Sequence, residues 1–150
     1  DKEQVLNHGN FRFPEPIPLT NTIHNILEKG KQADNLYFKK DHQYYPELEK
    51  TMTSKDTIYQ WRRVYVRENK SNVCPTLTAN MGTGGHNVPL ILDDFGIRKL
   101  TPKECFAFQG YPMEKYILPN IANSKLYMQA GNSVTTPLIE RISKEIIKLL

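Results

Sequence analysis

The sequence predicts an α+β fold, in which a small, irregular and mainly β region with short helices is followed by a C-terminal helix. Three observations predict this fold. Short runs of strand-favouring residues between positions 57 and 92 are separated by turns rich in Asn and Gly. Signals for helix starts stand on both sides of these runs. From position 137 onward, apolar side chains recur at helical spacing.

Length, hydropathy, charge and cysteine content limit the class of protein to which this chain can belong. A chain of 150 residues can bury one modest core or two small ones. No apolar run approaches the roughly 20 residues that a bilayer requires, so we expect no membrane partner. The sequence shows no signal peptide, so we expect a cytoplasmic location. The net charge of +4 fits a nucleic-acid partner without identifying one. Cys74 and Cys105 form no Cys-x-x-Cys pair and are expected to be reduced thiols.

The first predicted elements are an extended connector and two short helices. Residues 1–19 should form the connector, because their closely spaced prolines fix φ and restrict the preceding residues. Thr20 or Asn21 can cap a short helix that follows. The mostly polar stretch 39–56 should be solvated, with another short helix over 46–49.

Strands and a well-marked helix follow. Strands are predicted over residues 57–67, 74–79 and 88–92, where β-branched and aromatic residues are frequent. A capping box that begins at Thr101, with proline at the first helical position, predicts a helix over 102–109.

The last predicted helix begins near Pro137 and is amphipathic. Charged side chains occupy one face, and an apolar stripe occupies the other. The stripe consists of Leu138, Ile139, Ile142, Ile146 and Leu149. Such a stripe must pack against another apolar surface. The rest of the chain is not predicted to form a second sheet that could cover it.

Three blocks in the last third of the chain occur in a fixed order. They are Arg98-Lys99-Leu100-Thr101-Pro102-Lys103-Glu104-Cys105, Gln109-Gly110-Tyr111-Pro112 and Gln129-Ala130-Gly131-Asn132-Ser133-Val134. Together they resemble the last two motif blocks of the cytosine-C5 DNA methyltransferases. The Pro-Cys nucleophile motif, the Glu-Asn-Val motif and the glycine-rich donor loop of that family are not in this sequence. No catalytic residue is therefore assigned in this chain.

The resemblance implies three parts. Residues 1–19 would be the connector, 20–112 the target recognition domain, and 113–150 a return segment and helix that belong to the catalytic domain. That catalytic domain would be Rossmann-like, absent from this chain, and supplied by an N-terminal part or subunit carrying the catalytic cysteine. Duplex DNA and S-adenosylmethionine are the implied partner and cofactor, and no metal is expected.

The first candidate DNA contacts interleave arginine with aromatic residues. Arg62, Arg63 and Arg67 carry guanidinium groups that match guanine edges and phosphates. In the family, such a stretch forms the first recognition element, and Gln60 stands where several members place the residue that enters the space of the flipped cytosine. The alternative is a solvent-facing strand beside a buried Trp61.

The second candidate element is rich in glycine and small polar residues. Its proposed DNA contacts are Thr76, Thr78, Asn80, Gly82, Gly84 and Gly85. It resembles the second recognition loop of the family, whereas a plain glycine-rich hairpin is the alternative. A phosphate-binding P-loop is disfavoured because the Gly-Lys-Ser/Thr ending is missing. His86 lacks a second metal ligand nearby in the sequence.

The remaining candidate residues belong to the resembling blocks. Arg98, Thr101, Glu104 and Gln109 match the block that organises the recognition domain, so we expect a buried polar network rather than an acid and a base. The turn Asn132-Ser133-Val134 matches the contact to S-adenosylmethionine, and its alternative is an ordinary helix cap.

The resulting hypothesis is the site-specific DNA-recognition and closing portion of a DNA (cytosine-5-)-methyltransferase. A free-standing DNA-binding module and an inactive methyltransferase remnant are the alternatives. The donor turn and the apolar last helix favour the methyltransferase, since a module that only binds DNA needs neither.

Overall fold

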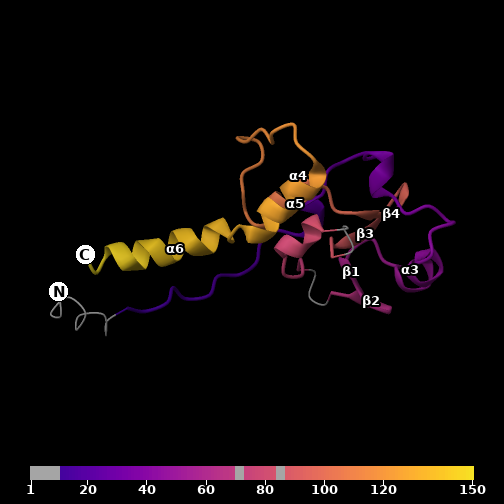
Figure 1. Ribbon diagram of the computed structural model, residues 1–150. Helices are drawn as coiled ribbons and strands as arrows, with labels where there is room; N and C mark the ends of the chain where they lie inside the picture. The colour runs from indigo at the N-terminus through magenta and orange to yellow at the C-terminus, as the bar shows by residue number, and fades with distance from the viewer. Residues whose placement is uncertain (1–10, 70–72, 84–86) are drawn as a thin grey trace.

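The computed structural model describes residues 11–69, 73–83 and 87–150 (Figure 1). Its helical elements are α2 (Ile23–Ile26), η2 (Asp34–Leu36), α3 (Tyr45–Thr51), η4 (Ala79–Gly82), α4 (Pro102–Phe108), α5 (Asn123–Asn132) and α6 (Thr136–Ile147). Its strands are β1 (Tyr59–Arg62), β2 (Tyr65–Glu68), β3 (Leu90–Asp93) and β4 (Gly96–Lys99). The described part of the chain therefore has the predicted α+β character.

The strands form one antiparallel sheet in the order β2-β1-β3-β4. Two hairpins, β1–β2 and β3–β4, meet at the single pair Tyr59 and Leu90. Arg63 lies in the turn of the first hairpin with a φ of 54°. Gly96, the first residue of β4 after the turn at Asp94 and Phe95, has a φ of 137°. The joint between the hairpins is short, so side-chain packing must hold the two halves together.

Apolar side chains cover both faces of the sheet. One cluster gathers Leu48, Met52, Tyr59, Val66, Leu90 and Ile97, and thus places α3 on the first face. The other includes Ile58, Leu77, Met81, Ile91, Leu100, Cys105, Tyr127 and Ala130, which brings α4, α5 and η4 to the second face. Consecutive residues of β3 enter different clusters because side chains alternate along a strand.

Several predicted elements are confirmed. The helix after Pro46 is α3, and α4 has the complete capping box, with Thr101 accepting from the Glu104 amide and the Glu104 carboxylate accepting from the Thr101 amide. Gly110 follows α4 with a φ of 83°, a conformation that ends a helix. The last helix, α6, begins at Thr136. No helix or strand interrupts residues 11–19.

Other expectations were wrong. The strand predicted over 57–67 is a hairpin, because Arg63 adopts a left-handed turn without the usual Gly or Asn. The strand predicted over 74–79 is an extended segment that runs into η4. The helix capped by Thr20 or Asn21 begins only after Thr22. Strand β4 and helix α5 were not predicted.

Helix α6 leaves the rest of the molecule as an arm (Figure 1). The connector over residues 11–19 runs beside it, and the Arg141 guanidinium donates a hydrogen bond to the Glu15 carbonyl. No residue of α6 is buried, and its apolar side chains remain partly open to solvent. Within the described residues, no helix has the length and apolar character needed to cross a membrane.

Candidate functional site

The β1–β2 hairpin separates apolar from polar side chains. Tyr59 and Val66 enter the core that includes α3. The register pairs Gln60 with Arg67 and Arg62 with Tyr65. Because directly paired residues of antiparallel strands share a face, these four side chains lie on the opposite face. The sheet therefore places two of the three predicted arginines, Arg62 and Arg67, on the same face.

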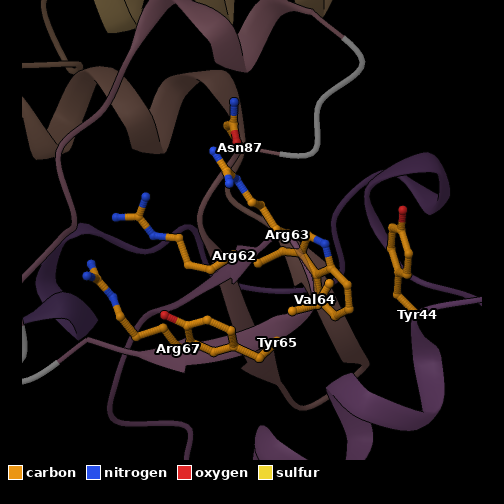
Figure 2. Close-up of a pocket in the computed structure, with 8 residues that line it drawn as sticks. Tyr44, Arg62, Arg63, Val64, Tyr65, Arg67 and Asn87 are labelled. Atoms are coloured by element: carbon orange, nitrogen blue, oxygen red, sulfur yellow. The ribbon is translucent and has the colours of Figure 1, made fainter.

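An open pocket of about 630 Å³ lies at the end of this hairpin (Figure 2). It is lined by Tyr44, Trp61, Arg62, Arg63, Val64, Tyr65, Arg67 and Asn87. Arg62 and Arg67 extend in a similar direction, while Arg63 is directed towards Asn87 (Figure 2). Within the described residues, no carboxylate lines the pocket, so it presents a concentrated positive charge. Such a surface suits a phosphate backbone or the acceptor edge of guanine.

Aromatic stacking supports one wall of the pocket. The rings of Tyr44 and Trp61 are 4.3 Å apart and inclined by 22°, which is a stacked geometry. Tyr44 belongs to the stretch over residues 39–56, which was expected to be solvated. Sequence reasoning missed Tyr44, and it placed Asn87 with the second candidate element rather than with the hairpin, because the nearness of both residues to the hairpin depends on the tertiary fold.

Gln60 does not project from the surface. Only 6% of it is exposed, and among the described residues its Oε1 atom has no hydrogen-bond partner. The Nε atom of Arg67, the paired residue, is also buried and has no hydrogen-bond partner in the described part of the chain, although its NH2 group donates to Asn69 over 3.3 Å. Unsatisfied buried polar atoms are costly, so this pair is the part of the hairpin with the most to gain from a polar ligand.

The second candidate element alternates between surface and core. Thr76, Thr78 and Asn80 are exposed, whereas Leu77 and Met81 are buried in the cluster that contains α5. The core therefore holds the segment while its polar side chains face outward. Gly82 ends η4. The candidate contacts Gly84 and Gly85 and the neighbouring His86 lie outside the described residues.

The block over residues 98–109 forms the expected buried network. Arg98 is 1% exposed and Glu104 is fully buried. Two parallel hydrogen bonds join them, from NH1 to Oε2 at 2.8 Å and from NH2 to Oε1 at 2.7 Å. Arg98 Nε also donates to Asp93 at 2.7 Å, and the Glu28 amide donates to Glu104 at 2.9 Å. The network ties β3, β4 and α4 to the segment after α2.

Electrostatics favours a structural role for this network. Burial alone lowers the pKa of Arg98, but hydrogen bonds and charges from Glu104 and Asp93 outweigh it and raise that pKa above its ordinary value. A guanidinium that stays charged and is enclosed by two carboxylates cannot act as an acid. Thr101 completes the network by accepting from the Glu104 amide and donating to Glu28 at 2.7 Å.

Gln109 joins this block to the candidate cofactor turn. Its Oε1 accepts from the Thr135 hydroxyl at 2.9 Å, and its backbone carbonyl accepts from the Thr136 amide at 2.8 Å. Asn132 is the last residue of α5 and therefore precedes the turn, and Ser133 is the C-cap residue of the helix. Asn132 and Val134 are exposed. Gln109 was assigned only to the structural block, so its contacts to the turn are new.

A second pocket, of about 480 Å³, opens beside this turn. It extends from the segment before η4 to the first turn of α6. Its lining residues are Cys74, Pro75, Thr76, Leu77, Phe108, Gln109, Ser133, Val134, Thr135, Leu138 and Ile139. The two candidate regions of the sequence, the loop and the cofactor turn, therefore share one hollow.

Neither cysteine has the properties of a nucleophile. Burial raises the pKa of Cys74 to about 12 and raises the pKa of Cys105 well above its ordinary value. Both side chains are thiols at neutral pH, whereas nucleophilic attack requires the thiolate. In the part of the chain that the structure describes, no three His, Cys, Asp or Glu side chains gather to hold a metal ion.

The chain is similar in sequence to a known protein family and to several curated proteins. The family described as C-5 cytosine-specific DNA methylase matches residues 1–148. The Type II methyltransferase M.Bsp6I of Bacillus sp. (strain RFL6) is 60% identical over 96% of this chain and 46% of its own length. M.SsoII of Shigella sonnei is 30% identical over 100% of this chain and 38% of its own. M.HaeII of Haemophilus aegyptius is 33% identical over 97% of this chain and 43% of its own length.

The chain thus spans less than half the length of these curated relatives, each of which is one longer protein. The family match, in contrast, covers nearly all of the chain. On this basis the chain belongs to the C-5 cytosine-specific DNA methylase family.

Proposed function

We propose that the chain is the DNA-recognition and closing portion of a DNA (cytosine-5-)-methyltransferase. In this role it binds duplex DNA at a specific site and completes a pocket for S-adenosylmethionine. The observation that carries the proposal is the pocket at the β1–β2 hairpin, where Arg62, Arg63 and Arg67 gather without a lining carboxylate among the described residues. Family membership supplies the reaction to which this surface would contribute.

The proposed DNA contacts come from two segments. They are Gln60, Arg62, Arg63, Arg67, Thr76, Thr78, Asn80, Gly82, Gly84 and Gly85. Exposed Arg62 and Arg63 can bind phosphates or the O6 and N7 acceptors of guanine. Thr76, Thr78 and Asn80 offer hydroxyl and amide groups at the surface of the second segment. Because Gln60 is buried, its insertion into a duplex would require the hairpin to open.

The proposed donor contacts are Asn132, Ser133 and Val134. Their chemistry fits one edge of S-adenosylmethionine, since an exposed amide and an exposed apolar side chain stand beside the hollow that Ser133 and Val134 line. When bound, that cofactor supplies the methyl group that cytosine C5 receives. The chain's own residues would hold and orient one side of the cofactor, and Gln109 would keep the turn in place.

The nucleophile is proposed to come from a catalytic part that this chain does not contain. Cys74 and Cys105 are protonated at neutral pH, and neither follows a proline as the family's nucleophile does. The exposed apolar stripe of α6 would dock on that catalytic part. A role in restriction-modification is proposed because the relatives are named Type II methyltransferases. The cytoplasmic location stays a prediction.

The test is methyl transfer from labelled S-adenosylmethionine to unmethylated duplex DNA. The chain alone, an N-terminal part with the nucleophile and donor motifs, and their mixture are assayed side by side. We expect activity only in the mixture, with the modified cytosine mapped by bisulfite sequencing. Strong methylation by the 150-residue chain alone would contradict the proposal.

A further inference from the structure

Gln60 and Arg67 face each other across the ladder that joins β1 and β2. Directly paired residues of antiparallel strands have their Cβ atoms about 4.5–5.5 Å apart, so these two side chains can meet. Both Gln60 Oε1 and Arg67 Nε are shielded from water, and within the described residues neither atom has a hydrogen-bond partner. In this part of the chain, an acceptor without a donor thus lies opposite a donor without an acceptor.

The other contact of Arg67 shows which edge of its guanidinium faces inward. The NH2 group donates to the Asn69 side chain at 3.3 Å. Asn69 is itself held in place, because its amide donates to the Ile58 carbonyl at 2.8 Å and its carbonyl accepts from the Thr57 hydroxyl at 2.9 Å. Nε and NH2 share one edge of the planar guanidinium. This inner edge has one anchor, and a second anchor at Nε would fix the direction of the whole group.

A fixed Arg67 would suit the surface to which it belongs. Arg62 and Arg67 extend in a similar direction from the same face of the hairpin (Figure 2). Among the described residues, no carboxylate lines the pocket into which they reach. A mobile arginine side chain loses rotational freedom when it binds a ligand, and this loss weakens binding. An arginine whose inner edge is already held loses less of that freedom.

We infer that Gln60 is a positioning residue for Arg67, whose Nε donates to Gln60 Oε1 so that the outer end of the guanidinium is directed to the DNA. This inference rests on the proposed function. It keeps Gln60 inside the hairpin, whereas the resemblance suggested that this residue enters the duplex. Rotation of the Gln60 side chain satisfies both buried atoms at once, and its withdrawal into a duplex would take this acceptor away from Arg67.

A double-mutant cycle on the full enzyme, with the catalytic part present, tests the pair. Gln60→Leu and Arg67→Leu each remove one polar partner. We expect each change to weaken binding to a duplex with the mapped methylation site by about five-fold or more. The double variant should bind no more weakly than Arg67→Leu alone. Arg62→Leu is the matched control, because Arg62 shares the face but pairs with Tyr65. In that background the loss from Gln60→Leu should be undiminished.

Extrusion of the target cytosine separates the two roles considered for Gln60. Cytosine must leave the stack to be methylated, and 2-aminopurine at the mapped position becomes fluorescent when it does so. A residue that only positions Arg67 is not needed for extrusion, so Gln60→Leu should reach full fluorescence at saturating enzyme. Loss of this fluorescence in Gln60→Leu but not in Arg67→Leu would overturn the inference. Independent losses in the cycle of Gln60 and Arg67 would overturn it as well.

A structure of the unaltered enzyme on its duplex gives an independent test if the variants misfold. Gln60 Oε1 should lie about 3 Å from Arg67 Nε, with Gln60 still inside the hairpin. A Gln60 side chain between base pairs, or an Arg67 Nε that donates to another acceptor, would overturn the inference. An enzyme that does not bind duplex DNA at all would instead refute the proposed function.

Discussion

Arg62 and Arg63 are exposed at the hairpin pocket, whereas Lys39 and Lys40 are exposed elsewhere on the surface. If either arginine reads a guanine, its replacement by alanine should cost roughly 1–3 kcal/mol on the cognate duplex and relax discrimination there. Lys39→Ala and Lys40→Ala should weaken binding little. Competition titrations with cognate and scrambled duplexes, at one salt concentration, measure the difference.

The two duplexes distinguish direct reading from charge attraction. Loss of a phosphate contact weakens binding to every sequence alike. Equal losses on cognate and scrambled DNA for both Arg62→Ala and Arg63→Ala would therefore remove these arginines from base readout.

Glu104 neutralises a guanidinium that has almost no access to water. Glu104→Gln should destabilise the fold by about 3–5 kcal/mol, because it leaves Arg98 buried with one carboxylate partner fewer. Glu140→Gln breaks an exposed pair with Lys144 and should change stability little. Urea unfolding followed by circular dichroism compares the two variants, and similar midpoints would contradict a stabilising role for the buried pair.

At the scale of elements, helix α4 was predictable because its signals are local. Thr101, Pro102 and Glu104 stand within one turn and specify the start of the helix. Helix α5 has no such start, since its N-cap residue is Ala122, which makes no side-chain cap. Its stability comes from packing on η4 and α4, which no short sequence window contains. The hairpin was missed for a similar reason, because Arg63 carries no turn signature.

The candidate site also contains contacts that the sequence predicted and contacts that it did not. The Arg98 and Glu104 network was predicted, because matching motif residues with opposite charges within one block naturally pair. The burial of Gln60 and the contact of Gln109 with Thr135 were not predicted, since both depend on segments far apart in the sequence. Sequence therefore predicted contacts within one block more reliably than contacts between segments that are far apart in the chain.

Helix α6 should be the element that docks on the catalytic part. Ile142→Asp with Ile146→Asp should abolish assembly, because both changes place a charge in the apolar stripe. Each side chain of the stripe that docking buries contributes roughly 1.5–3 kcal/mol before entropy losses. Lys144→Asp with Lys148→Asp places two carboxylates on the polar face instead, with a larger change in net charge, and should leave assembly intact. Co-purification with the catalytic part measures both, and undiminished assembly of the isoleucine variant would show that α6 is not the docking element.

At the scale of the whole molecule, the isolated chain exposes the α6 stripe. We expect concentration-dependent self-association, since exposed apolar stripes associate with one another. Sedimentation velocity over a range of concentrations should show it, and adding the catalytic part should replace the self-associated species with one mixed complex. A chain that stays monomeric at every concentration, with the stripe exposed, would contradict this expectation.

The paired path of the connector and α6 has an evolutionary consequence. The chain enters and leaves the body that contains the sheet on one side, where Arg141 contacts Glu15 (Figure 1). A body attached at one place behaves as an insertion, and insertions whose ends lie together are well tolerated. Loops such as the one that contains Arg63 can then lengthen, shorten or be exchanged without moving the place where the connector and α6 run side by side. Under the proposed function, replacing this body would give a new target sequence, while the catalytic part on the other side of the attachment would be inherited unchanged.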